Sequence, residues 1–235
     1  MVRRHTRVSS CAVSARTDVM GWNKNDDTGT RRGYHHGNLR EALIRAALEL
    51  IAKKGPSGFS FAEAARAAGV SPAAPYRHFR DRDALMADVA ERGFEAFAHD
   101  LEAAWNKGTP NPRAAFDRVG KAYLAFARRE PALFSAMFES GISFVDFPAV
   151  REAGDRAFAV LRTACEAVAA SYPAGRRPPA AMMALHIWSL SHGIATLFAR
   201  GDASRRPIPM SPEELLEAAT LIYLDGLDRP APDTR

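Results

Sequence analysis

One helix-starting pattern recurs three times in this chain, and it constrains the fold more than any other feature. A capping residue is followed three positions later by glutamate, whose carboxylate can return to the backbone N–H of the capping residue. The three pairs are Asn38 with Glu41, Ser60 with Glu63, and Ser211 with Glu214. After each pair, apolar residues recur at three- and four-residue spacing, and the alternation typical of strands is almost absent. The sequence therefore predicts an all-α fold.

Glycine, proline and aspartate mark further helix boundaries. Gly69 ends a short second helix, and Pro131 forces a boundary at the residue before it. Asp81 opens a long helix that joins the N-terminal third to the rest of the chain. Residues 180–199 form a helix that is apolar nearly all round, which requires cover on two faces. A final helix is expected over residues 212–227.

Positive charge is concentrated in the N-terminal third. Residues 1–80 hold 14 Lys and Arg against 6 Asp and Glu, whereas residues 81–235 hold 18 against 21. Neutralisation of phosphates by Lys and Arg supplies most non-specific affinity for nucleic acids. The N-terminal third is therefore expected to meet an anionic partner, although a merely solvated basic face would carry the same charge.

Composition and motifs exclude several classes of protein. The chain is 47% hydrophobic and 25% charged, as in globular domains, and no run of 18 apolar residues predicts a bilayer span. Cys11 and Cys165 lack disulfide or zinc spacing, which favours a reducing cytoplasm. The adjacent His35 and His36 have no third metal ligand nearby. No P-loop, dinucleotide fingerprint or nucleophile elbow is present, so we expect neither an enzyme nor a cofactor.

The first 30 residues have no helical period. Their apolar stretch is too short for a secretory signal peptide. We expect a disordered N-terminal arm over residues 1–30, with Met20 as an alternative start.

Residues 60–79 have the pattern of a helix-turn-helix: a short helix, a glycine turn, and a second helix that opens with small residues. Ser71 is the expected cap of this second helix, and Pro72 is expected at its first position. Pro75 then removes the first intrahelical hydrogen bond, so we expect a loose or 3₁₀-like first turn. Pro75→Ala is accordingly expected to keep or raise thermal stability.

Residues 34–90 resemble the N-terminal domain of TetR-type (tetracycline-repressor-like) bacterial transcriptional regulators. The resemblance rests on Ala68-Gly69-Val70-Ser71 at the turn and on Tyr76-Arg77-His78-Phe79 at the end of the recognition helix. It implies a three-helix DNA-binding domain over residues 31–82, joined by the long helix to a helical ligand-binding and dimerisation domain over residues 83–235.

The resemblance and helix geometry together predict the DNA contacts. Tyr76 and His78 are implied as phosphate donors, and Arg77 reaches a guanine edge or a phosphate. Small residues in the first turn allow the backbone to approach the groove, and Ser60 is a helix cap that also has the option of a phosphate contact. Arg82 matches a basic position of the family. The full predicted set is Arg31, Arg32, Tyr34, His35, Ser60, Ser71, Pro72, Ala73, Ala74, Tyr76, Arg77, His78 and Arg82.

The C-terminal part contains Trp188-Ser-Leu-Ser-His192-Gly193, which is similar to the Trp-x-x-x-His-Gly signature of one TetR-type subgroup. Trp188 and His192 are four residues apart and share a helical face. Packing at a helix crossing and ligand sensing both remain open for this pair.

Aromatic residues are abundant in the C-terminal domain, and most are expected in its core. Some are expected to line a cavity for a small apolar effector, as the resemblance implies. The predicted ligand-binding residues are Phe97, Leu101, Phe116, Tyr123, Phe126, Phe138, Phe158, Trp188 and His192. The family pattern also implies a homodimer formed by the last two helices.

The leading hypothesis is a ligand-responsive homodimeric repressor that binds a palindromic double-stranded DNA operator in the cytoplasm, with no membrane partner. The alternative is an effector-independent activator or architectural DNA-binding protein. An apolar cavity in the C-terminal domain counts against that alternative.

Overall fold

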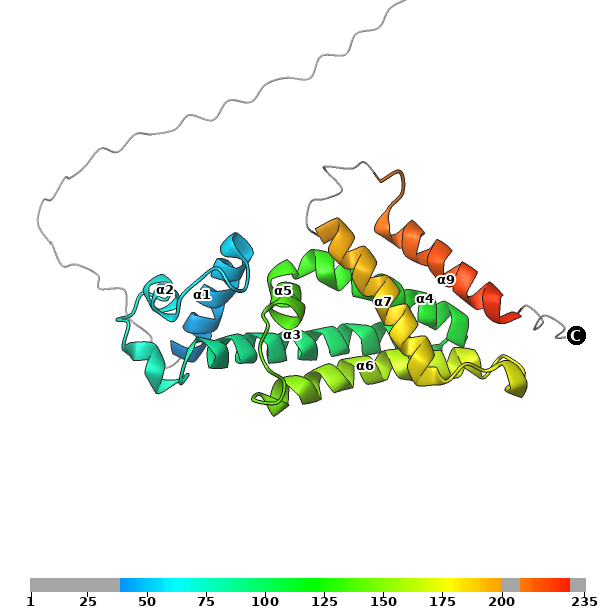
Figure 1. The fold of residues 1–235 in the computed structure, drawn as a ribbon, viewed down its shortest axis with the longest axis horizontal. Coiled ribbons are helices and arrows are strands. Elements are labelled where there is room, and N and C mark those ends of the chain that lie inside the picture. Colours follow the sequence, from blue (N-terminus) through cyan, green and yellow to red (C-terminus); the bar gives the residue numbers. More distant parts are fainter. Residues whose placement is uncertain (1–38, 200–207, 229–235) are drawn as a thin grey trace, which may run out of the picture. The chain divides into compact units, whose positions relative to one another are not determined.

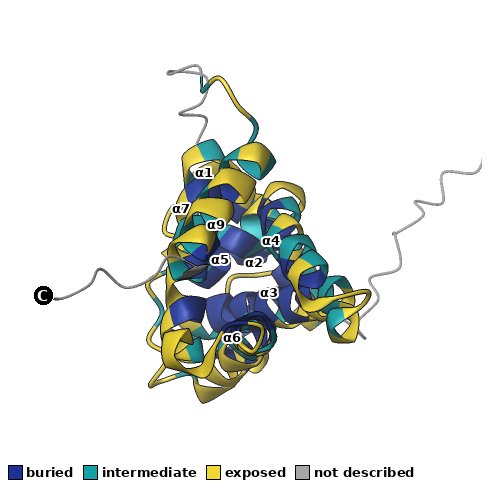
Figure 2. Cartoon of the chain, turned by 90° about the vertical axis from the view of Figure 1, so that its right-hand side faces the viewer, coloured by how far each residue is buried: buried dark blue, intermediate teal, exposed yellow. Residues whose placement is uncertain are grey.

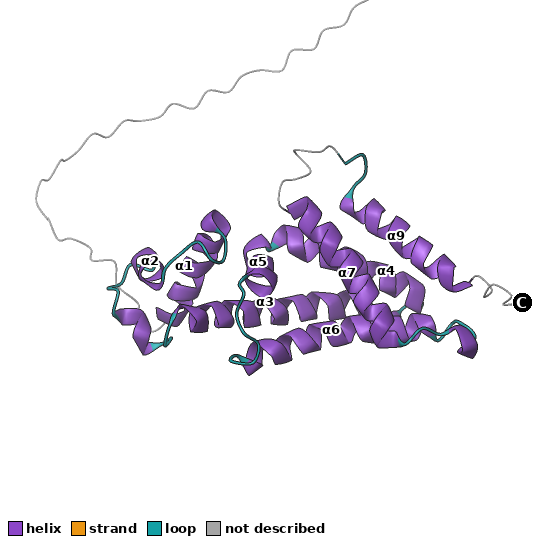
Figure 3. Cartoon of the chain, in the orientation of Figure 1, coloured by secondary structure: helices purple, strands orange, loops and turns teal. Residues whose placement is uncertain are grey.

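The computed structural model describes residues 39–199 and 208–228 (Figure 1). Every regular element in these ranges is helical (Figure 3), which confirms the all-α prediction. The α-helices are α1 (Leu39–Lys54), α2 (Phe61–Ala67), α3 (Arg82–Trp105), α4 (Pro112–Arg129), α5 (Pro131–Glu139), α6 (Pro148–Ala169), α7 (Ala180–Ala199) and α9 (Pro212–Asp228). Three 3₁₀ segments are η1 (Ala74–Arg77), η2 (Asn106–Gly108) and η3 (Ala174–Arg176).

Local sequence signals set most of these boundaries. The Ser60–Glu63 capping box is present in both directions at α2, and Ser211 and Glu214 exchange the same two hydrogen bonds at α9. Asp81 caps α3 by accepting from the Ala84 N–H at 2.8 Å. Pro131 lies at the start of α5, where its missing N–H leaves no hydrogen bond unmade. The expected cap at Asn38 lies outside the described residues.

The recognition helix differs from its prediction. The segment is a 3₁₀ helix of four residues, and its N-cap is Ala73, so the expected α-helical start at Ser71 and Pro72 is wrong. Pro75 has no N–H to donate to the Ser71 carbonyl, which accepts instead from the Ala74 N–H at 3.0 Å. The expected 3₁₀ character is confirmed, and it extends to the whole element.

Two clusters of buried side chains form the interior, and α3 contributes to both. The N-terminal core packs α1, α2 and Phe79 against Leu85, Met86 and Val89 of α3. The C-terminal core begins further along α3 and includes residues of α4, α5, α6, α7 and α9. Figure 2 shows the dark blue of buried residues on the inward sides of these helices. Ala136 of α5 belongs to the N-terminal core, so α5 joins the two clusters.

Helix α7 corrects the expectation that no segment is apolar and long enough to span a bilayer. Ala180–Ala199 meets that criterion by length and composition, because its scattered polar residues lower the mean hydropathy only slightly. A single helix of this kind is weak evidence for a membrane, since core helices of globular proteins also meet the criterion. One third of its apolar stretch is buried, against α4, α6 and α9. Much of its apolar surface is therefore left uncovered within one chain.

Candidate nucleic-acid interface and ligand cavity

The turn and recognition element present an exposed polar surface. Tyr76 is 63% exposed, and Arg77 and His78 are also exposed. Ser71, Pro72 and Ala73 are exposed before them, and Ala74 is half-buried. Seven of the predicted DNA contacts therefore lie between Ser71 and His78, and all of them except the half-buried Ala74 are exposed.

Buried neighbours hold this segment in place. Pro75 is fully buried and Phe79 is 4% exposed, so both ends of the 3₁₀ turn are anchored in the N-terminal core. The Tyr76 ring stands edge-on to Phe61 of α2, with 5.1 Å between the ring centroids. The contact fixes the ring, and much of Tyr76 stays accessible. This geometry suits a side chain that donates its hydroxyl to a phosphate.

Ser60 and Arg82 are engaged within the protein. The Ser60 hydroxyl accepts from the Glu63 N–H at 3.2 Å, and Lys54 binds the same glutamate at 2.7 Å. The Lys54 hydrogen bond, followed by those from Ser60, lowers the pKa of Glu63 to about 2. Arg82 donates to the carbonyls of Phe59 and Pro56, and its guanidinium lies over the Phe59 ring at 4.8 Å. Arg82 thus ties the start of α3 to the turn before α2.

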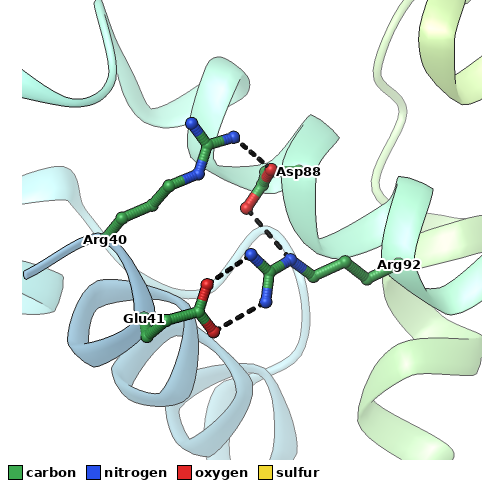
Figure 4. Close-up of polar contacts among 4 residues, drawn as sticks. All are labelled: Arg40, Glu41, Asp88 and Arg92. Carbon is green, nitrogen blue, oxygen red and sulfur yellow. Dashed lines mark hydrogen bonds and ion pairs between the residues drawn. The ribbon is translucent and has the colours of Figure 1, made fainter. Parts of the chain in front are cut away.

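An ion-pair network between α1 and α3 was not predicted from the sequence (Figure 4). Arg92 forms a two-pronged pair with Glu41, and Asp88 binds both Arg40 and Arg92. The hydrogen bond from Arg92 lowers the pKa of Glu41, and the same contact raises the pKa of Arg92. The sequence around Glu41 predicted a capping box with Asn38. It contains no indication of the ion pair with Arg92, which lies 51 residues further along the chain. The network braces α1 against the long helix.

Four predicted DNA contacts, Arg31, Arg32, Tyr34 and His35, lie outside the described residues, as does the arm over residues 1–30. Their roles stay predictions. The structure adds Arg66 as an exposed cation in the last turn of α2, which the sequence analysis did not single out.

A cavity of about 320 Å³ lies in the C-terminal domain, within the range of small-molecule sites. It is lined by α3, α4, α5, α6, α7, α9 and the loop before α6. Seven of the nine predicted ligand-binding residues line it together: Phe97, Leu101, Phe116, Tyr123, Phe138, Phe158 and Trp188. Phe94 and Phe144 also line the cavity, although neither was among the predicted ligand-binding residues.

The other two predicted residues lie behind the cavity wall. Phe126 is fully buried against Phe97, with ring centroids 5.0 Å apart. His192 packs between Phe134 and Phe138 and forms a hydrogen bond between its Nδ1 and the Tyr123 hydroxyl at 3.0 Å. Burial lowers the pKa of His192, with the charge of Glu139 acting in the opposite direction. His192 therefore supports the cavity-lining Tyr123 from behind.

Charged side chains gather where α4 and α9 meet the cavity, and they form two ion pairs there. Lys121 binds Asp117 at 2.8 Å, and Glu213 of α9 binds Arg128 of α4 at 2.7 Å. The deeper lining is aromatic and aliphatic, and Ser191 is its buried hydroxyl. Such a cavity favours an apolar body over a charged one, because burying an unpaired charge is costly. No group of metal ligands occurs among the described residues.

The exposed basic turn and the helical domain behind it define a DNA-binding protein of the helix-turn-helix class. Comparison with protein families gives the finer assignment. Residues 43–89 match the model described as bacterial regulatory proteins, tetR family, and residues 116–222 match the tetracyclin repressor-like C-terminal domain. The chain belongs to the TetR family of transcriptional regulators, a family of regulators and not of enzymes.

Solved structures share the fold of this chain. A protein of unknown function from Rhodococcus sp. RHA1 is 33% identical, with 84% of this chain and 100% of that chain covered at a TM-score of 0.67. The TetR family regulator PfmR from Thermus thermophilus is 22% identical, with coverage of 80% and 99% at a TM-score of 0.61. A TetR-family regulator from Bordetella parapertussis 12822 is 20% identical, with coverage of 83% and 100% at a TM-score of 0.61. The comparison with curated proteins found no match.

Proposed function

We propose that this chain is a ligand-responsive repressor that binds a palindromic DNA operator as a homodimer in the cytoplasm and is released by a small apolar effector. The observation that carries this proposal is the shared use of α3. Its first half anchors the helix-turn-helix, and its second half lines the aromatic cavity. A ligand that binds better to a DNA-incompetent arrangement shifts the population away from the operator.

The uncovered apolar surface of α7 and α9 supports the homodimer. Ile222 is 75% exposed, and Met182, Leu185, Leu197 and Leu221 are also exposed. A second copy of the same two helices would cover these side chains in a four-helix bundle. Two recognition elements related by a two-fold axis then require half-sites about 34–36 Å apart, or somewhat more.

The proposal extends to the subgroup of the C-terminal domain. The Trp188–Gly193 segment resembles the Trp-x-x-x-His-Gly signature, and Trp188 lines the cavity. Trp188 and His192 also pack together at 5.8 Å between ring centroids. Trp188 lines the cavity and His192 packs behind it. The pair is therefore compatible with both ligand sensing and helix packing.

Selection of bound sequences from a random DNA pool at moderate salt tests DNA recognition. We expect a palindromic sequence with nanomolar affinity. Tyr76→Ala should abolish most of this affinity, whereas Tyr76→Phe keeps the ring on Phe61 and loses only the hydroxyl. Salt-sensitive binding without sequence preference would instead support the architectural alternative.

Effector binding and dimerisation have separate tests. N-phenyl-1-naphthylamine, a neutral fluorescent aromatic probe, should bind the cavity and release the selected DNA, and Ala157→Leu should reduce probe binding. Sedimentation should give a dimer that Ile222→Glu converts to a monomer. Val145→Glu is the matched control, because Val145 is 89% exposed on a loop far from α7 and α9 in sequence. A wild-type monomer bound to DNA would contradict the homodimer.

A further inference from the structure

The loop between α5 and α6, residues 140–147, has one aromatic ring at the cavity and another at the DNA-binding domain. Figure 3 shows this loop in teal between the two helices. Phe144 is 40% exposed, lines the cavity, and stands edge-on to Phe94 with 6.3 Å between the ring centroids. Phe147 lies three residues later and packs against the C-terminal core.

Phe147 is in contact with the segment that follows the recognition element. The Arg80 guanidinium lies over the Phe147 ring at 5.3 Å. Arg80 directly follows Phe79, which is buried in the N-terminal core and anchors the 3₁₀ turn. A cation over an aromatic face is an attractive contact with a defined geometry. A movement of Phe147 therefore acts on the end of the DNA-binding turn.

Hydrogen bonds close residues 143–147 of the loop into a tight turn. The Phe147 N–H donates to the Ser143 carbonyl at 3.2 Å, and the Asp146 N–H donates to the Ser143 hydroxyl at 3.3 Å. Pro148 then fixes the backbone as α6 begins. Phe144 and Phe147 therefore sit on the same closed turn, which gives a short backbone path between the two rings.

Space is available for a movement of Phe147. An open surface groove runs beside its contact with Arg80, lined by His78 and Phe79 on one side and by Asp146 and Phe147 on the other. The loop is thus held by the ring contacts and the turn, without close packing along its whole length.

We propose that residues 140–147 couple the two sites: occupation of the Phe94–Phe144 end of the cavity displaces Phe144, and the turn carries that displacement through Phe147 to Arg80 and the recognition element. This coupling rests on the proposed ligand-responsive function. Phe144, Phe147 and Arg80 are positioning residues in this scheme, since they act on the DNA-contacting side chains through Phe79.

A substitution inside the cavity can stand in for the ligand. Gly154 of α6 lines the cavity beside Phe94, and an added Cβ would meet that ring at 3.7 Å, an ordinary contact. Gly154→Leu places its first carbon in ordinary contact with Phe94, which packs against Phe144, so the larger side chain reaches the Phe94–Phe144 end of the cavity. Leucine is also a better helix former than glycine, so this variant is expected to fold.

A double-mutant cycle on affinity for the selected operator tests the coupling. Gly154→Leu should weaken operator binding about tenfold, a typical coupling between sites. In a Phe147→Leu background, which keeps apolar volume but removes the ring, the loss should fall to about twofold or less. Phe198→Leu is the matched control, because Phe198 is also a half-buried phenylalanine packed against the C-terminal core, but it lies in α7 and lines neither of the two hollows described above. There the tenfold loss should persist.

An equal loss in the Phe147→Leu background would overturn the proposal and place the coupling in α3. The absence of any loss in Gly154→Leu alone would also overturn it. Amide hydrogen exchange gives a readout without DNA: residues 76–82 should exchange faster in Gly154→Leu, and Phe147→Leu should suppress the increase. Failure of the wild type to select a DNA sequence or bind N-phenyl-1-naphthylamine is a different result, because it overturns the proposed function itself.

Discussion

Helix α3 runs through two cores that are packed in different ways. In its first half, Leu85 and Val89 are fully enclosed by the helices of the DNA-binding domain. In its second half, Phe97 and Leu101 are equally inaccessible to solvent but border a cavity of about 320 Å³. Burial alone therefore does not distinguish the two regions. One core uses its apolar surface for close packing, whereas the other leaves contacts unmade that a ligand can supply.

Matched leucine truncations on α3 give the largest expected effect. Leu85→Ala should lower the free energy of unfolding by about 3 kcal/mol, since it opens a new void in a closed core. Leu101→Ala should cost about half as much, because part of its side chain already faces empty space. Urea unfolding of the two variants measures the difference.

Both variants remove the same atoms from nearly fully buried positions on one helix, so each is the control for the other. Equal losses would show that the C-terminal core is as closely packed as the N-terminal core in solution.

Replacing a buried alanine by leucine in each core tests the same difference in packing by adding volume instead of removing it. Ala47 of α1 is 0% exposed in the N-terminal core, and Ala47→Leu should destabilise by about 2 kcal/mol through overpacking. Ala157 of α6 is 3% exposed and lines the cavity, so Ala157→Leu should stabilise by about 1 kcal/mol. Thermal unfolding of the two variants measures whether each substitution lowers or raises the stability. Destabilisation by Ala157→Leu would mean that the cavity closes in solution.

The helices could be predicted because their boundaries are encoded locally. Ser60 with Glu63, Asp81, Pro131 and Ser211 act within one turn of their own positions, so the sequence around them is sufficient. The recognition element shows the limit of local reading. Pro75 predicted the 3₁₀ character, but its burial against the N-terminal core depends on distant residues.

The cavity and the ion-pair network depend on contacts between distant segments. The sequence predicted seven lining residues, six of them aromatic. The fact that Phe97 lines the cavity, whereas Phe126 does not, depends on which face of each helix meets the others. The Glu41–Arg92 pair joins residues 51 positions apart. No periodicity in one segment contains such information.

Burial of Pro75 reverses the stability effect expected from the sequence. Pro75→Ala should lower the free energy of unfolding by about 1 kcal/mol, because the buried ring loses apolar contacts and the unfolded chain gains freedom. Pro72→Ala is the matched control, since Pro72 is exposed in the same turn. Its cost should be within about 0.5 kcal/mol of zero. A more stable Pro75→Ala variant would restore the original expectation.

His192 gives the smallest expected effect, a pH dependence of stability. It tests whether water reaches this side chain behind the cavity wall. Burial lowers the pKa of His192 in the folded chain, and its Nδ1 lies 3.0 Å from the Tyr123 hydroxyl, whose own pKa is raised by burial. The unfolded chain takes up a proton as the pH falls through about 6.5, while the folded chain resists it. Stability from this group is therefore present above that pH and decreases below it.

Between pH 7.5 and 5.5, the melting temperature of the wild type should fall more than that of His192→Asn, which keeps an acceptor but does not titrate. His99→Asn, at an exposed position of α3, should behave like the wild type. Equal slopes for wild type and His192→Asn would mean that water reaches His192 and that the wall behind Tyr123 is open.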